Sequence, residues 1–135
     1  MKESNSKIIG YVSKKVCDDL NLEEQIGKSI KMTAPLLEHI AKHSEEYESV
    51  ESCLYTISNV SDIINDPDYI YFNNKNNSIE FYKYLKEYVS VVVKVTNKKN
   101  LYIASIYPVK KSKIDNRMEK KAWDKYVAID EEDNI

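Results

Sequence analysis

The chain has 135 residues, 42% of them apolar, which is enough for one hydrophobic core and too short for two domains. We therefore expect a single domain over residues 1–135, with flexible ends at 1–6 and 128–135. The net charge of −2 excludes a uniformly basic nucleic-acid coat. Residues 1–10 carry no signal-like apolar stretch and the longest apolar run is interrupted by polar residues, which predicts a cytoplasmic protein without a membrane span.

The charges are distributed unevenly along the chain. Lys94–Lys125 holds ten Lys or Arg against three Asp or Glu, whereas the remaining residues hold ten against nineteen. A segment of one sign is typical of a surface that binds a phosphate-rich ligand, although a solvated lysine-rich face gives the same count. Cys17 and Cys53 have no C-x-x-C motif and no histidine nearby, so we expect reduced, buried thiols.

The first half of the chain alternates between short extended and helical patterns. Ile8–Ser13 is β-like, Lys14–Leu20 fits a short helix, and Ile26–Lys31 fits a short extended segment. Thr33 is a suitable N-cap for a helix that runs to about His43. These patterns place the first elements without specifying which of them pair.

A second helix is predicted from Glu51 to Asn65, where the breaker N-D-P-D ends it. The pattern then becomes that of strands, and Lys113–Tyr126 fits a terminal helix. Four strands are predicted, at Tyr69–Asn73, Ser78–Leu85, Tyr88–Asn97 and Leu101–Val109. This order predicts an α+β fold with N-terminal helices on one face of a four-stranded antiparallel meander and a C-terminal helix.

The last hairpin allows a prediction of register. Its turn is N-K-K-N at 97–100, and an even-length loop pairs residues whose numbers sum to 197. One face would then pair Val91 with Ile106, Val93 with Ala104 and Val95 with Tyr102, and should lie on the helices. The other would pair Ser90 with Tyr107, Val92 with Ser105 and Lys94 with Ile103. We therefore expect Lys94, Ser105 and Tyr107 on one surface.

Both histidines lie in L-L-E-H-I-A-K-H, four residues apart, so His39 and His43 should share one helix face. The spacing resembles H-E-x-x-H, but Ile40 replaces the glutamate and no third ligand is obvious, so we predict no metal and no other cofactor. Imidazoles can act as general acid or base near pH 7. Taken alone, a surface histidine pair more often has a packing or capping role.

The eleven tyrosines, seven of them between Tyr69 and Tyr107, have two interpretations. Strand-borne tyrosines interleaved with lysines can stack on bases, and they can equally pack at sheet edges with a solvated hydroxyl. The sequence has no Gly-rich phosphate loop and no G-x-S-x-G. Nucleotide-triphosphate and acyl-transfer chemistries are therefore disfavoured.

The motifs H-I-A-K-H, N-D-P-D-Y-I, V-V-V-K-V and I-A-S-I-Y-P-V, in this order, resemble the phage and mobile-element members of the barnase–EndoU–colicin–RelE-like nuclease superfamily. The resemblance covers roughly residues 8–115. It implies a metal-independent ribonuclease that binds RNA on the open sheet face and uses the ribose 2′-hydroxyl as nucleophile. His39 and His43 match its helix histidines, Pro67-Asp68 its helix stop, and Lys94, Ser105 and Tyr107 its strand positions.

The resulting prediction is a toxin-like endoribonuclease. His43 would be the first general acid or base with His39 assisting, Lys94 would stabilise the scissile phosphate, and Ser105 and Tyr107 would orient it. Backbone phosphates would be held by Lys98, Lys110, Lys111, Lys113 and Arg117. The expected partners are RNA, with tRNA one candidate, and a cognate inhibitor protein. The alternatives are a non-catalytic phage-derived regulator that binds nucleic acid or an acidic partner through its basic C-terminal segment, and a structural domain without a ligand.

Overall fold

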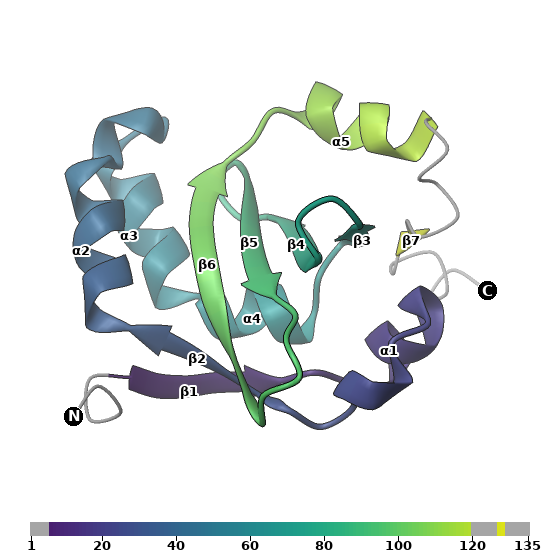
Figure 1. The fold of residues 1–135 in the computed structure, drawn as a ribbon. Coiled ribbons are helices and arrows are strands. Elements are labelled where there is room, and N and C mark those ends of the chain that lie inside the picture. Colours follow the sequence, from purple (N-terminus) through teal and green to yellow (C-terminus); the bar gives the residue numbers. More distant parts are fainter. Residues whose placement is uncertain (1–5, 120–126, 129–135) are drawn as a thin grey trace.

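The computed structural model describes residues 6–119 and 127–128. A sheet in the order β1-β2-β6-β5-β4-β3-β7 runs through them, with helices on both of its faces (Figure 1). The strands are β1 (Ser6–Tyr11), β2 (Ser29–Thr33), β3 (Tyr69–Asn73), β4 (Ser78–Tyr84), β5 (Tyr88–Lys94), β6 (Asn100–Pro108) and the two-residue β7 (Val127–Ala128). The helices are α1 (Lys14–Leu20), α2 (Ala34–Lys42), α3 (Val50–Ser58), α4 (Val60–Asn65) and α5 (Lys111–Glu119), with 3-10 turns η2 (Glu23–Gln25) and η3 (Ser44–Glu46).

The predicted α+β class is confirmed, but the sheet is larger than predicted. Strands β3 to β6 form the expected antiparallel meander. Strands β1 and β2 form an additional antiparallel pair, and β2 pairs in parallel with β6 through Ser29–Asn100, Ile30–Leu101 and Lys31–Tyr102. The prediction of a four-stranded antiparallel sheet was therefore wrong in detail. Parallel pairing joins segments about seventy residues apart, and hydrophobic patterning does not specify such a partner.

The predicted helix from Glu51 to Asn65 is two helices. Asn59 ends α3 and begins α4, and its side-chain amide donates to the Tyr55 carbonyl at 2.7 Å. Asparagine readily forms such local hydrogen bonds, which compete with continuous helix. The apolar periodicity continues across the break because Cys53 and Val60 both enter the same core. The predicted stop before Pro67 is confirmed, since α4 ends at Asn65.

The ends of the chain also differ from expectation. Ser6 and Ala128, which we placed in flexible ends, belong to β1 and β7. The predicted C-terminal helix begins two residues early, at Lys111, and its predicted continuation over 120–126 lies outside the described residues.

The main core lies between the meander and helices α2, α3 and α4, and Val16, Cys17 and Leu20 of α1 also belong to it (Figure 1). Alternate residues of β5 face these helices, and Val89, Val91 and Val93 are fully buried. Cys17 and Cys53 are free, buried thiols, as predicted, and burial raises the pKa of both. The opposite face of the meander packs on α5, where Ile114 is fully buried against Tyr82. Within the described part of the chain, no helix is both long and apolar enough to cross a membrane.

The β5–β6 hairpin follows the predicted register over half its length. Four pairs sum to 197, from Val89–Pro108 to Val92–Ser105, and the next pair is Val93–Ile103. Ala104 is the extra residue of this bulge, so the predicted partners of Val93, Lys94 and Val95 were wrong. The bulge has a physical reason: it turns Ile103 into the core, where it is 7% exposed. Tyr102 takes its place opposite Lys94.

Candidate nucleic-acid interface and active site

The two histidines are neighbours on α2, as their spacing predicts. The Thr33 hydroxyl accepts a hydrogen bond from the Leu36 amide and begins the helix, and His43 is its C-cap residue. The ring centroids of His39 and His43 are 4.5 Å apart. Leu36 and Ile40 face the core from the same helix, so the histidines lie at its outer edge.

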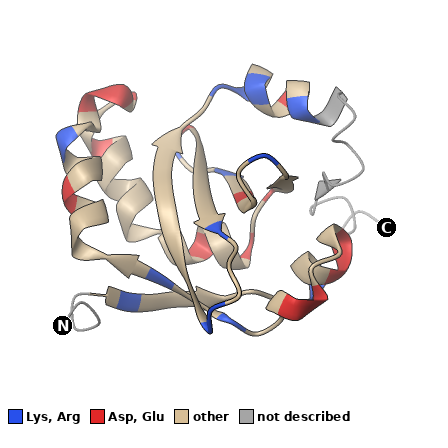
Figure 2. Ribbon diagram, in the orientation of Figure 1, with Lys and Arg blue, Asp and Glu red and all other residues tan. Residues whose placement is uncertain are grey.

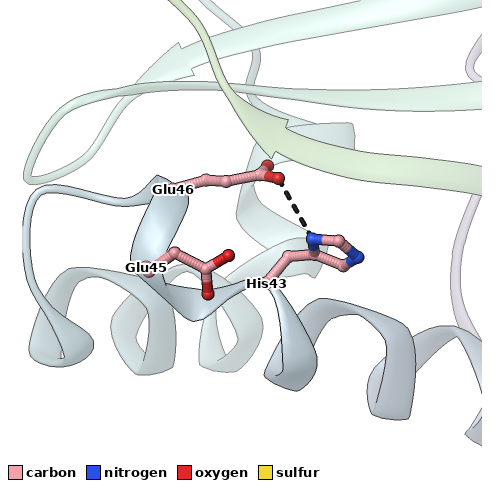
Figure 3. Close-up of side chains that lie close together, drawn as sticks. All are labelled: His43, Glu45 and Glu46. Carbon is pink, nitrogen blue, oxygen red and sulfur yellow. Dashed lines mark ion pairs between the residues drawn. The ribbon is translucent and has the colours of Figure 1, made fainter.

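His43 points to the carboxylate of the following turn (Figure 3). Its Nδ1 lies 3.1 Å from Oε2 of Glu46, and both side chains are about half exposed. The donor atoms of His43, Glu45 and Glu46 lie within 4.8 Å of one another. Exposed donors of this kind are common on surfaces that hold no ion, and we assign no metal to them.

On the other side of the sheet, the hairpin register places Lys94, Ser105 and Tyr107 on one face. Tyr107 lies opposite Ser90, Ser105 opposite Val92, and Lys94 opposite Tyr102. We call this surface the open face. Its cations extend onto α5, where Nζ of Lys113 donates to the Tyr107 hydroxyl at 3.4 Å. The open face therefore carries hydroxyls and positive charges side by side, which suits a phosphodiester.

A charged network forms the floor of the open face. Glu80 of β4 lies opposite Val92 and is only 3% exposed. Its Oε1 lies 3.2 Å from Nε of Arg117 and accepts a hydrogen bond from the Tyr82 hydroxyl, while its Oε2 accepts from Nδ2 of Asn73 at 3.0 Å. The guanidinium of Arg117 also lies over the Tyr71 ring, 4.2 Å from its centroid.

The network shifts the ionisation of its members. Burial, the negative charge of Glu80 and the hydrogen bond to it raise the pKa of Tyr82 far above its ordinary value. Burial lowers the pKa of Arg117, but the hydrogen bond with Tyr82 and the charge of Glu80 outweigh it, so the pKa rises. Both groups therefore stay protonated around the carboxylate at neutral pH. Strongly coupled, buried charges of this kind gather at functional sites as well as in structural ion pairs.

Two buried hydroxyls lie on the same sheet face as this carboxylate. Ser78 and Ser90 lie on strand positions of the open face, next to Lys94 and Tyr82 in the register. Within the described ranges, neither Oγ has a hydrogen-bond partner, and the exposed fraction of each residue is at most 1%. Unpartnered buried hydroxyls are uncommon and mark polar sites or strain.

The sequence-based reasoning missed Glu80 and Tyr82. A charged residue between Ile79 and Phe81 has the pattern of an ordinary solvated strand position. The signal that could have found it is the register of the β4–β5 hairpin, which pairs Ser78 with Lys94 and so puts Glu80 on the face of Lys94.

An open groove of about 470 Å³ lies at one end of the sheet, near the β4–β5 turn. Tyr84, Lys110 and Lys111 line it, together with Glu46, which connects it to His43. Two of the predicted phosphate-binding lysines therefore lie in this groove. Lys98 lies elsewhere, in the β5–β6 turn, where its amide donates to the Thr96 hydroxyl.

Positive and negative charges lie on different elements of the fold (Figure 2). Lys and Arg gather on α5 and the β5–β6 turn, whereas Asp and Glu gather on α1 and at the connection of α2 to α3. Arg117, predicted to hold a phosphate, is engaged by Glu80 instead. Its two polar contacts both use Nε, so within the described residues its Nη groups make no hydrogen bond or ion pair.

The structure does not join the histidines to the predicted strand residues. Helix α2 packs its apolar side on the core face, whereas Lys94 lies on the reverse face. Glu46 lines the groove together with Pro108, which pairs with Val89 of β5. Val89 is five residues, or about 17 Å, along β5 from Lys94. Among the described residues, no hydrogen bond, ion pair or ring contact connects His39 or His43 with Lys94, Ser105 or Tyr107. The physical reason is that Leu36 and Ile40 fix the orientation of α2.

Comparison with known proteins bears on this geometry. A family model described as phage-Barnase-EndoU-ColicinE5/D-RelE like nuclease3 matches residues 7–116, which span β1 to the middle of α5. Glu80, Lys94, Ser105 and Tyr107 lie within the match, and Arg117 follows directly after it. Curated proteins and solved structures gave no significant match. Since the match covers most of the chain, the protein belongs to the phage barnase–EndoU–colicin E5/D–RelE-like nuclease 3 family.

Proposed function

We propose that the protein is a metal-independent endoribonuclease whose reaction takes place on the open face, over Glu80. The observation that carries this proposal is the contact of the buried Glu80 carboxylate with Arg117, on a face where Lys94, Ser105 and Tyr107 are accessible. A base and fixed cations within one site are what cleavage by an internal hydroxyl requires. Membership of a nuclease family supports a nucleic-acid substrate.

In the proposed reaction, Glu80 accepts the proton of the ribose 2′-hydroxyl, and the 2′-oxygen forms a bond to phosphorus. The guanidinium of Arg117 gives up its Nε contact with Glu80 and turns its Nη groups to the phosphate, where they stabilise the charge that develops on the phosphate oxygens. The bond from phosphorus to the 5′-oxygen then breaks, and the Tyr107 hydroxyl, beside Lys113, donates the proton that this oxygen takes up. The products are a 2′,3′-cyclic phosphate and a 5′-hydroxyl.

The remaining residues of the open face position the RNA. Ser105 of β6 and Glu80 of β4 lie at the same level of the sheet, since both are opposite Val92 of the intervening strand β5. Lys94 lies two residues, or about 7 Å, further along β5 and would hold the adjoining phosphate. The proposed setting is cytoplasmic, with RNA, tRNA included, as substrate and a cognate inhibitor as protein partner.

His39 and His43 are the second candidate for acid and base. Two observations support this alternative role: the sequence motif, and the pairing of His43 with Glu46, which orients the imidazole. In this alternative the reaction would take place at the groove that Glu46 lines, near Lys110 and Lys111. Comparing the His43→Ala and Glu80→Gln proteins separates the two sites.

The test is incubation of the purified protein with total RNA in EDTA, followed by analysis of the fragment ends. We expect cyclic phosphate ends from the unmodified protein, loss of cleavage in Glu80→Gln, and unchanged cleavage in the control Glu38→Gln on the exposed side of α2. Intact RNA after incubation with a folded sample would refute the nuclease proposal.

A non-catalytic binding protein is the alternative function. It is favoured by the burial of Glu80 beneath α5, where Arg117 occupies the carboxylate. In that case the basic segment that contains Lys110, Lys111 and Lys113 would bind RNA or an acidic partner without cleaving it. Binding without fragments, weakening steeply as salt is raised, would identify this function.

A further inference from the structure

We infer that the groove at the β4–β5 end of the sheet is a second RNA subsite, which binds one nucleotide whose base carries an exocyclic amino group. The inference rests on the proposed function, because it extends the RNA beyond the reacting nucleotide. Its basis is a cavity of about 470 Å³, which is within the range of small-molecule sites. The cavity is lined by an exposed aromatic ring, and by a cation and a carboxylate whose side chains have no polar partner among the described residues.

The aromatic part of the groove is an exposed tyrosine pair. Tyr84 and Tyr88 lie opposite each other at the end of the β4–β5 hairpin, with ring centroids 5.0 Å apart in an edge-to-face arrangement. The Tyr88 ring is partly buried against α5, whereas Tyr84 is 55% exposed. A large ring held in place by a neighbour and open to solvent is a stacking surface for a base, whichever base it is.

The cation that would meet the phosphate is Lys110. Lys111 beside it pairs with Asp115 at 3.2 Å, but Lys110 has no ion pair or hydrogen bond through its side chain within the described residues. Lys113 continues the line of cations to Tyr107 on the open face. This line offers a path for the RNA backbone from the reacting phosphate to the groove.

The carboxylate gives the groove a preference among bases. The Glu87 carboxylate already has partners at the start of α3, since its Oε2 accepts hydrogen bonds from the Glu48 amide and the Ser52 hydroxyl. The Glu46 carboxylate is paired with His43. The Glu48 carboxylate has no such partner among the described residues. A carboxylate accepts from exocyclic amino groups, which adenine, cytosine and guanine have and uracil lacks.

The location of the groove defines which nucleotide it would bind. Tyr84 is four residues along β4 from Glu80, or about 14 Å. A nucleotide in the groove would therefore belong to the same short RNA segment as the cleaved one without being that nucleotide. The subsite would affect affinity and sequence preference and leave the bond-breaking step to the residues around Glu80.

The experiment is binding of labelled 2′-O-methyl tetranucleotides of adenine, cytosine or uracil, measured by fluorescence anisotropy. These probes lack the 2′-hydroxyl and cannot be cleaved by it. Tyr84→Leu should weaken binding of the adenine and cytosine probes about tenfold, within the range for loss of one base stack. Tyr84→Phe should retain binding. The control Tyr11→Leu removes a tyrosine of matching exposure, 54%, on β1 and should change binding less than twofold.

Base preference gives a second readout. The unmodified protein should bind the cytosine probe more tightly than the uracil probe, and Glu48→Gln should reduce that difference. Equal binding by Tyr84→Leu and the unmodified protein would overturn the subsite, whether or not RNA is cleaved. Tyr84-dependent binding by a protein that leaves RNA intact would support the subsite while refuting the ribonuclease proposal.

Discussion

Arg117 of α5 holds Glu80 of β4 through Nε at 3.2 Å, and this contact joins the helix to the sheet face on which it packs. The carboxylate side chain is 4% exposed and the guanidinium side chain 23% exposed. Removal of either partner from a buried pair leaves a charge without compensation, which costs more than the pair contributes. Stability and the proposed chemistry therefore depend on the same two groups.

The first prediction concerns this pair. Arg117→Gln should lower the free energy of unfolding by about 3 kcal/mol, because Glu80 would remain buried without its cation. The double variant Arg117→Gln with Glu80→Gln should recover part of the loss. Urea denaturation of the four proteins gives the coupling energy, and strictly additive losses would contradict the prediction.

The second prediction is a loss of stability at high pH. The pKa of Tyr82 is raised in the folded protein above its ordinary value of 10.0, and that of Tyr47 is raised by burial. Above pH 10 the unfolded chain releases these phenolic protons first, so it binds fewer protons than the folded state and stability falls with rising pH.

Each phenol contributes up to about 1.4 kcal/mol per pH unit once the unfolded chain is ionised. Urea denaturation at pH 8, 10 and 11 should show a first decline above pH 9.0, where the unfolded chain ionises the Cys17 and Cys53 thiols, whose pKa is raised in the folded protein, and a further decline above the ordinary tyrosine pKa. Tyr82→Phe should have a shallower decline. An identical slope in that variant would show that Tyr82 is not responsible.

The third prediction tests whether the cations beside the open face, and not those elsewhere on the surface, contact RNA. Lys113→Gln should reduce the slope of log affinity against log salt for single-stranded RNA by about 0.7, the value for one released counterion. Lys14→Gln is the control, since Lys14 pairs with Asp18 on α1. Filter binding between low and moderate salt measures both, and equal slopes in all three proteins would exclude Lys113 from the interface.

The fourth prediction concerns the histidines. His43→Ala should change the free energy of unfolding by less than about 1 kcal/mol, because its contact with Glu46 is half exposed. Cleavage of RNA should continue in this variant if Glu80 is the base. Loss of cleavage with unchanged stability would instead move the chemistry to α2.

The sequence predicted α2, the meander and the shared face of Lys94, Ser105 and Tyr107 because each depends on local periodicity. It did not predict the parallel pairing of β2 with β6, which depends on a contact distant in sequence. It also did not predict the Glu80 network. The partner Arg117 comes from α5, and no short-range pattern connects a strand carboxylate to a helix 37 residues later.

The histidines illustrate the same limit. Their spacing correctly places the two rings together, but the orientation of α2 on the sheet is fixed by Leu36 and Ile40 in the core. A motif on one helix therefore predicts neighbours on that helix and gives no direct information about which sheet face they meet.

The extra residue at Ala104 determines which side chains the second half of the hairpin turns towards the open face. If Ala104 instead paired with Val93 in an unbroken ladder, Ile103 would replace Tyr102 beside Lys94, and the Tyr102 phenol would turn towards the core where Ile103 now lies. A single exposed alanine thus sets the chemical character of the surface around Lys94 without contributing a functional group to it.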